Sequence, residues 1–298
     1  MKILLLGKDG QVGHELQRTL LPLGPLQAHN RSTIDLSQLD QLQARLDAYS
    51  PDVIVNAAAY TAVDKAESDA DAAHRINSQA VQALAQYATA RSALLVHYST
   101  DYVFDGAKAQ PYLPDDQTNP QSVYGASKLA GEEAILASGC AALVFRTSWV
   151  FSAYGGNFVK TILRLARERD TLNIVSDQHG APTSAELIAD VTAHAILAHA
   201  GGRLRNGIHH LSASGSTSWL GLAKHVAERA LKNGAPLKAT PDRIAAIRTE
   251  QYPLPARRPK NSRLDTSELQ QALGLQLPHW SVHADRTVDQ LTLQERST

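Results

Sequence analysis

The sequence predicts an α/β protein with a doubly wound parallel sheet and a smaller C-terminal lobe. Short apolar runs alternate with longer helical patterns through the first half of the 298 residues. Runs that are apolar throughout, rather than at every second position, are typical of parallel strands covered by helices on both faces. The strands are expected at residues 2–6, 25–29, 52–57, 93–99 and 142–148.

The expected helices fill the gaps between these strands, at residues 11–21, 37–49, 70–91 and 121–137. Later in the chain, the run 171–176, a helix at 184–199 and the run 207–212 are expected to extend the same sheet. The other segments, about 150–170 and 215–298, repeat no earlier pattern and include the Arg-rich "PARRPKNSRLD". They are expected to form the smaller lobe.

Composition limits the classes of partner. Lys and Arg together number 29, as do Asp and Glu, so no net charge favours nucleic acid or an anionic membrane. The single cysteine, Cys140, cannot form an internal disulfide. No apolar run reaches 18 residues, and the apolar start "MKILLLG" is too short for a signal-peptide core. We therefore expect a soluble, cytoplasmic protein with neither a nucleic-acid nor a membrane partner.

The first strand leads into a glycine-rich turn, "KILLLGKDGQVGHEL", which contains Gly7, Gly10 and Gly13. Glycines allow a tight turn and close approach to a pyrophosphate, which the free N–H groups of the following helix attract. The GxxGxxG spacing is wider at its front than the usual dinucleotide motif, and a purely structural turn is the alternative. Its place at the first strand–helix junction predicts a Rossmann-type dinucleotide-binding domain made of residues 1–149 and about 171–214. The smaller lobe would then bind the substrate.

The residue after the second strand distinguishes the two nicotinamide dinucleotides. No acid follows directly, and Arg31 lies close by, which favours the 2′-phosphate of NADPH over the 2′-hydroxyl of NADH. Arg31 could equally be an ordinary surface charge. Asp35 could face the adenine or cap the helix expected near Ser37. Both NADPH and NADH stay open as cofactors.

A hydroxyl and a phenol are expected to converge at the sheet edge. The strand 93–99 is followed directly by Thr100, Asp101 and Tyr102, where open α/β sheets place their ligands. Tyr124 and Lys128, in "YGASK", lie four residues apart on one face of a helix. An ammonium one turn away would make the phenol a usable general acid. Such a pair is often structural, but here it accompanies Thr100 and the glycine turn.

Together these motifs resemble the extended short-chain dehydrogenase/reductase superfamily, and within it the dTDP-4-dehydrorhamnose reductases. The resemblance covers nearly the whole chain, through "GKDGQVG", "DVIVNAAAYTAVDKAE", "STDYVFDG", "YGASKLAGE", "RTSWVF", "SDQHGAPT" and "ARRPKNSRLD". It implies NAD(P)H-dependent reduction of the C4 ketone of a dTDP-sugar, the last step of dTDP-L-rhamnose biosynthesis, with Thr100, Tyr124 and Lys128 as catalytic residues.

The resemblance also implies the binding residues. Those at the cofactor would be Gly10, Gln11, Val12, Asp35, Leu36, Ala59, Tyr60, Thr61 and Tyr98, together with Tyr124 and Lys128. Those at the sugar nucleotide would be Thr61, Val63, Asp101, Tyr102 and Trp149, together with Thr100 and Tyr124.

Three further expectations concern single features. Trp149 could offer a flat face to a sugar or belong to the core. One of Arg258, Lys260 and Arg263 could bind the diphosphate, or all three could be solvated charges. The family places Mg²⁺ among carboxylates where two copies meet, and Glu15 and Glu186 match two such positions. The third falls at Gln290 beside Asp289, so surface carboxylates without metal are the preferred interpretation, and a homodimer stays open.

Two alternative functions are weighed against the reductase. A sugar-nucleotide 4-epimerase would share the same sheet and cofactor site, whereas a dehydratase needs an acid after Asp101, where this chain has Tyr102. A non-catalytic subunit that regulates a methionine adenosyltransferase carries a similar "STDYVFDG" stretch. It would have no need for Thr100, Tyr124 and Lys128 together.

Overall fold

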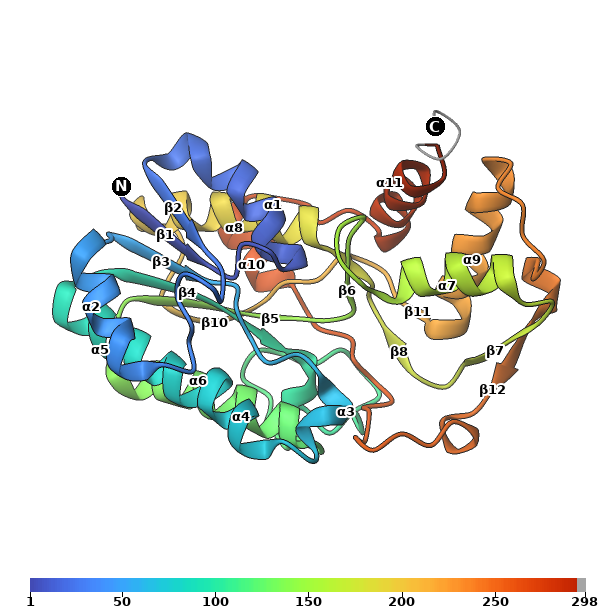
Figure 1. Ribbon diagram of the computed structural model, residues 1–298, viewed down its shortest axis with the longest axis horizontal. Coiled ribbons are helices and arrows are strands. Elements are labelled where there is room, and N and C mark those ends of the chain that lie inside the picture. The colour runs from blue at the N-terminus through green and yellow to red at the C-terminus, as the bar shows by residue number, and fades with distance from the viewer. Residues whose placement is uncertain (294–298) are drawn as a thin grey trace.

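The computed structural model describes residues 1–293, and the last five residues of the expected segment 215–298 lie outside them. Its centre is a six-stranded parallel sheet in the order β10-β5-β4-β3-β1-β2 (Figure 1). The strands are β1 (Ile3–Leu6), β2 (Leu26–His29), β3 (Val53–Asn56), β4 (Leu94–Thr100), β5 (Ala142–Thr147) and β10 (Gly207–His210). All five strands expected in the first half are confirmed, and so is the extension by the run 207–212.

Helices cover both faces of this sheet (Figure 1). On one face lie α1 (Gln11–Leu20) and α8 (Ala185–Ala200), with α10 (Ser267–Leu273) packed against α8. The other face carries α2 (Leu39–Tyr49), α5 (Ala80–Arg91) and α6 (Val123–Ser138). The chain runs from β1 outward to β2 and then returns to β3 on the other side of β1. This reversal of strand order is where an open α/β sheet forms its crevice.

The expected helix at 70–91 is continuous but not uniform. It consists of α4 (Ala70–His74), a π-helical turn at Arg75–Gln79 and α5. Short helices α3 (Val63–Ala66) and η3 (Asp101–Val103) follow β3 and β4. π-Helical turns occur frequently at functional sites because they redirect one side chain. Here the turn places Asn77, which is 1% exposed, toward the ends of the strands.

The smaller lobe combines segments that are far apart in sequence. Its helices are α7 (Phe158–Glu168), α9 (Trp219–Lys232) and α11 (Trp280–Leu293). Its strand pairs are β7 (Leu172–Val175) with β12 (Ile244–Ile247), and β8 (His179–Gly180) with β11 (Thr217–Ser218). A further pair, β6 (Val150–Phe151) with β9 (Thr183–Ser184), leads into it. Short 3₁₀ turns η1 (Leu21–Leu23), η4 (Pro241–Arg243) and η5 (Thr249–Gln251) complete the elements.

The prediction that residues 171–176 extend the central sheet is wrong. This run forms β7, which pairs in parallel with β12 at the far end of the smaller lobe. The physical reason is its exposure. A strand inside a parallel sheet is buried on both faces, whereas in β7 only Leu172 is buried and Asn173 is exposed. Four residues with apolar character were too few to distinguish the two positions.

One hydrophobic core joins the sheet to the smaller lobe. Buried residues beneath α1 and α8, such as Leu5 and Phe145, belong to the same cluster as Ile162 of α7 and Val226 of α9. A separate cluster, which includes Leu84, fills the space between the sheet and helices α2 and α5. Because the first cluster is continuous, the lobe is held at a fixed place beside the carboxyl ends of the strands.

Candidate active site

The glycine turn after β1 forms a cradle that accepts no side chains. Gly7 has φ +87°, and a Cβ atom there would lie 2.6 Å from the backbone nitrogen of Ala58. A Cβ at Gly13 would lie 2.0 Å from the carbonyl oxygen of Gly7. Helix α1 begins just after Gly10, which supplies no side-chain cap. No side chain therefore caps the first N–H groups of the helix, which leaves them free to bind a pyrophosphate. The residues present fit a dinucleotide.

The side chains after β2 contact one another. Arg31 is 80% exposed, and its Nε lies 3.3 Å from Oδ2 of Asp35. The other carboxylate oxygen of Asp35 accepts a hydrogen bond from the backbone N–H of Ser37 at 2.9 Å. Asp35 therefore closes the turn before α2 but does not cap that helix, whose N-cap is Gln38 without a side-chain hydrogen bond. Arg31 stands at the surface and is accessible to a phosphate group, so its role stays a prediction.

Several expected cofactor residues have side chains engaged in packing. Leu36 is 5% exposed and lies in the core beside α2. The hydroxyl of Tyr98 forms a 2.8 Å hydrogen bond with Thr192 of α8. Gln11 accepts a hydrogen bond from Asn157, whereas Val12 is partly buried against the core. The contact of these residues with the cofactor stays a prediction.

The segment after β3 is fixed by Asn77, a residue that the sequence analysis missed. The Asn77 amide accepts from the backbone N–H of Tyr60 at 2.9 Å and donates to the carbonyl oxygen of Tyr60 at 3.0 Å. It also donates to Ser127 of α6. Ala59 and Thr61, which flank Tyr60, are thereby held at the sheet edge, where Val63 begins α3. An asparagine inside a helical pattern gave no signal of this role.

The structure brings Thr100 and Tyr124 together. Thr100 ends β4, and its hydroxyl lies close enough to the phenol of Tyr124 to lower the pKa of that phenol. The approach of α6 depends on Gly125, because a Cβ there would lie 2.3 Å from the carbonyl oxygen of Tyr102. Ser122 caps the start of the helix by accepting from the N–H of Gly125 at 3.1 Å. The predicted convergence of a hydroxyl and a phenol is therefore present.

Lys128 occupies a different environment from the expected one. It is 1% exposed, and its Nζ lies 3.1 Å from Nε2 of His97, a buried residue of β4. Burial raises the pKa of the Tyr124 phenol to about 12, although the Thr100 hydroxyl opposes the rise. Burial is the dominant influence on this phenol, and the expectation that Lys128 makes it more acidic stays a prediction. A phenol that stays protonated still serves as a proton donor.

Asp101 and Tyr102 follow Thr100 in the short helix η3. Asp101 is 3% exposed and accepts a hydrogen bond from Thr100 at 3.1 Å. Burial raises its pKa to about 6, although a hydrogen bond with Ser262 opposes the rise. The Tyr102 ring meets the Tyr124 ring edge-on, with 5.6 Å between centroids. Both residues therefore border the phenol, as the resemblance implies.

Trp149 has less free surface than expected. It has a left-handed backbone conformation with φ 49°. Its ring stacks on Trp219 with 3.6 Å between centroids. The chain also passes close to this ring, because a Cβ at Gly180 would lie 2.7 Å from it. One face of Trp149 is therefore covered by Trp219, and a sugar could contact only the remaining surface.

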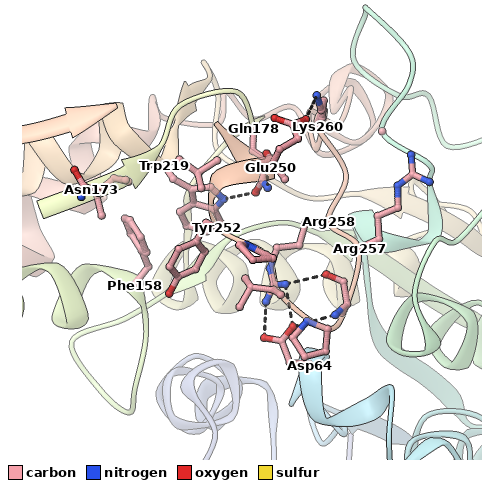
Figure 2. A pocket seen from close by; sticks show the side chains of 18 of the residues that line it. Asp64, Phe158, Asn173, Gln178, Trp219, Glu250, Tyr252, Arg257, Arg258 and Lys260 are labelled. Atoms are coloured by element: carbon pink, nitrogen blue, oxygen red, sulfur yellow. Dashed lines mark hydrogen bonds and ion pairs between the residues drawn. The ribbon is translucent and has the colours of Figure 1, made fainter. Parts of the chain in front are cut away.

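A cavity of about 980 Å³ opens between the sheet edge and the smaller lobe (Figure 2). Phe158, Trp219 and Tyr252 supply aromatic surface, and the indole N–H of Trp219 donates to Gln178. The sequence analysis did not identify these aromatic residues, because they belong to separate segments that only the fold brings together. A volume of this size suits a ligand with several rings.

The three basic candidates for a diphosphate site differ in position. Arg258 lines the cavity and donates to both carboxylate oxygens of Asp64, at 3.0 and 2.7 Å. Lys260 also lines it and pairs with Glu250 at 3.1 Å (Figure 2). Arg263 instead donates to Asn261 and to the carbonyl oxygen of Ala109. Arg257, which was not predicted, also lines the cavity.

The carboxylates considered for Mg²⁺ face protein cations. Glu15 lies 3.7 Å from Arg18, and Glu186 lies 3.3 Å from Arg286 and 3.4 Å from His283. The hydrogen bond with His283 lowers the pKa of Glu186, with further contributions from Arg286 and Gln290. Within residues 1–293 no cluster of three or more metal-ligating side chains is found. This donor set does not fit a divalent cation.

Comparison with known proteins identifies the family. The family model described as RmlD substrate binding domain matches residues 1–293. The chain belongs to this family. It is 48% identical to the dTDP-4-dehydrorhamnose reductase of Escherichia coli K12 over 98% of each chain. It is 49% identical to the reductase of the same name from Burkholderia thailandensis, over 94% of this chain and 95% of that one.

Solved structures agree with this assignment. A dTDP-4-dehydrorhamnose reductase from Clostridium acetobutylicum superposes with a TM-score of 0.89 at 32% identity, over 98% of this chain and 99% of that chain. The reductase from Bacillus anthracis, solved in complex with NADP, superposes with a TM-score of 0.86 at 31% identity, over 97% and 99%. A dTDP-glucose 4,6-dehydratase from Streptomyces venezuelae, at 19% identity, shares the fold. No helix within the described residues is long and apolar enough to cross a membrane.

Proposed function

We propose that this protein is an NAD(P)H-dependent reductase that converts dTDP-4-dehydro-β-L-rhamnose to dTDP-β-L-rhamnose, the last step of dTDP-L-rhamnose biosynthesis and a source of cell-surface polysaccharide precursor. The observation that carries the proposal is the proximity of the Thr100 hydroxyl to the Tyr124 phenol at the carboxyl edge of the sheet. The glycine cradle that ends at Gly13 lies at the same edge. Reductases of that name match nearly the whole chain.

The chain's own residues have distinct parts in this reaction. Bound NAD(P)H would supply the hydride that reduces the sugar ketone. Thr100 would hold the ketone oxygen by a hydrogen bond, and Tyr124 would donate the phenolic proton to that oxygen as negative charge develops. Lys128, buried one helical turn from Tyr124, would orient the cofactor. The raised pKa of Tyr124 keeps its proton available at neutral pH.

The cavity supports the sugar-nucleotide substrate. Its aromatic wall, Phe158 and Trp219, suits a base or sugar ring, and its cationic rim, Arg258 and Lys260, suits a diphosphate. Arg258 is already paired with Asp64, so a diphosphate would share or displace that carboxylate. Asp101 and Tyr102 border the phenol, where the sugar ring has to lie. We place the nucleotide toward Trp219 and the sugar toward Tyr124.

The division of labour along the chain follows. Residues 1–149 and the later segment ending near 214 would bind the cofactor, and 150–170 with 215–298 would bind the sugar nucleotide. Because β7 pairs with β12, we assign residues 171–176 to the substrate lobe. A cytoplasmic location and a homodimer stay predictions, and the ion-paired Glu15 and Glu186 argue against a need for Mg²⁺.

Isotope transfer tests this function directly. NADPH carrying deuterium at the transferred position of nicotinamide C4 should place deuterium on the sugar C4 of dTDP-rhamnose. Mass spectrometry and NMR of the product locate the label. Label at another carbon, or no cofactor oxidation with this substrate, would overturn the proposal. A panel of other 4-keto-6-deoxy sugar nucleotides then defines the sugar specificity.

The same assay separates the alternative functions. A 4-epimerase returns the hydride to its substrate, so the cofactor would not be consumed in step with product. A regulatory subunit would oxidise no cofactor with any ketosugar nucleotide. The proximity of Thr100 to Tyr124 favours the reductase over the regulator, since a purely structural role does not require a proton donor at the carboxyl edge of the sheet.

A further inference from the structure

His97 is a buried titratable residue to which the proposed reaction assigns no part. It lies in β4, is 1% exposed, and contacts Lys128 on one side and Asn56 of β3 on the other. Nε2 of His97 lies 3.1 Å from Nζ of Lys128, and Nδ1 lies 3.2 Å from Nδ2 of Asn56. The three side chains form a continuous line beneath the sheet edge.

The orientation of the Asn56 amide follows from its second contact. The backbone N–H of Ala58 donates to Oδ1 of Asn56 at 3.2 Å, and a backbone N–H can only donate. Oδ1 is therefore the acceptor in this contact, and Nδ2 is the atom that faces His97. Because Nδ2 of Asn56 donates a hydrogen to Nδ1 of His97, Nδ1 must carry no hydrogen of its own.

This requirement fixes the imidazole tautomer. A neutral imidazole carries one hydrogen, so with Nδ1 bare the hydrogen is on Nε2 and points at Nζ of Lys128. Burial holds the pKa of His97 far below its usual value, so the ring is neutral. A hydrogen on Nε2 is satisfied only if Nζ accepts it, which a neutral amine does and an ammonium does not.

We propose that Asn56 and His97 are positioning residues that hold Nζ of Lys128 in place and favour its neutral amine over its ammonium form. Protonation of the amine by solvent would force the imidazole hydrogen from Nε2 to Nδ1, where it would meet the amide hydrogens of Asn56. Burial also lowers the pKa of Lys128 to about 8, against the opposing charge of Glu132. The network would thus set the upper pH limit of turnover.

The other groups around Lys128 do not explain why its neutral amine would be favoured over its ammonium form. On α6 itself, Glu132 forms a 2.6 Å ion pair with Arg146 of β5, which offsets its charge. The Tyr124 phenol is neutral up to high pH. Asp101 of η3 raises the pKa of Tyr124, and Glu67, the residue after α3, accepts from the N–H of Val123. The group that contacts Nζ directly is His97.

The tautomer can be measured without substrate. In ¹⁵N-histidine-labelled protein, the His97 signals are identified among the 12 histidines by their loss in His97→Gln. Above about pH 8, where the Lys128 amine is neutral, we expect the Nε2–H form, with Nδ1 unprotonated. The Nδ1–H form in the wild-type protein under those conditions would overturn the inference. This arm is independent of the proposed reductase function, on which only the pH profile rests.

The pH profile is tested with Asn56→Asp. An aspartate keeps the acceptor for Ala58 but accepts from Nδ1–H of His97, so it reverses the tautomer and lets Nε2 accept from an ammonium. The alkaline limb of kcat/KM should then move up by about one pH unit. His97→Gln, whose amide oxygen can accept from an ammonium without adding charge, should move it in the same direction.

A matched control is available at the other edge of the sheet. Asn206 also accepts from a backbone N–H, that of Ala142, and its Oδ1 lies 2.8 Å from Nε2 of His199. Asn206→Asp introduces the same charge beside a histidine near the amino end of β5. It should leave the alkaline limb in place. An unchanged limb in folded Asn56→Asp, or an equal shift in Asn206→Asp, would contradict the inference.

Discussion

Replacing Tyr124 with phenylalanine removes one oxygen from the site and little else. The phenol lies beside the Thr100 hydroxyl, but that hydroxyl donates to Asp101 at 3.1 Å and accepts from the N–H of Tyr102 at 3.2 Å. The hydroxyl of Thr100 therefore keeps two partners in the variant. The ring of residue 124 keeps its edge-on contact with Tyr102. We expect a folded protein whose free energy of unfolding falls by only about 0.5–1.5 kcal/mol.

The loss of activity should be much larger than the loss of stability. Removing a positioned general acid lowers turnover by roughly 10²–10⁴-fold. At about 1.36 kcal/mol per factor of ten, the activation barrier rises by about 2.7–5.4 kcal/mol. Because burial raises the pKa of Tyr124 to about 12, the phenol is protonated at all ordinary assay pH values. The ratio of wild-type to variant kcat should therefore stay constant between roughly pH 6 and 8.

The assay is NADPH oxidation with dTDP-4-dehydrorhamnose, accompanied by cofactor affinity and denaturant unfolding. Tyr87→Phe is the matched control, because Tyr87 is buried and its hydroxyl donates to the carbonyl oxygen of Leu46 far from the site. That variant should lose similar stability and no activity. Retention of more than about one tenth of wild-type turnover by Tyr124→Phe would refute the assignment of this residue as the proton donor.

Further predictions concern the cofactor and the fold. Arg31→Ala should raise the Kd for NADPH and leave that for NADH unchanged, as titration of both cofactors will show; equal losses would remove Arg31 from 2′-phosphate recognition. Lys128→Met should lower both turnover and cofactor affinity, and an unchanged cofactor Kd would contradict the dual role. Glu132→Gln leaves Arg146, 2% exposed, without its buried carboxylate and should cost about 3–5 kcal/mol in denaturant unfolding; exposed Glu168→Gln, the control, should cost under about 1 kcal/mol.

The sequence predicted the parts of the fold that depend on local pattern. Each strand of the first half is a short apolar run, and β4 ends at Thr100, directly after the predicted boundary at residue 99. The glycine turn was recognisable because Gly7 and Gly13 allow close approaches that no other residue could make. Tyr124 followed from helical spacing. Each of these features is specified by residues close together in sequence, so it can be predicted without knowledge of tertiary contacts.

The missed features depend on contacts between distant segments. Trp219 meets Trp149 across 70 positions of sequence, and neither residue type distinguishes a cavity wall from a core. His97 is one of 12 histidines, and its importance comes from Asn56 on the neighbouring strand and Lys128 on a later helix. Burial, which the sequence does not report, is the largest influence on the pKa of Tyr124.

Arg258 shows how two motifs that were interpreted separately act as one physical unit. The segment after β3 and the Arg-rich segment near the end of the chain are joined by the bidentate contact between Asp64 and Arg258. The N–H of Ala256 also donates to Asp64 at 3.2 Å, so one carboxylate fixes both the backbone and the guanidinium of the later segment. The hydrogen bond with Arg258 holds the pKa of Asp64 below its usual value, so this link persists at neutral pH. The substrate lobe is therefore positioned at the cavity by Asp64 of helix α3, and ligand binding at Arg258 has to act against this same contact.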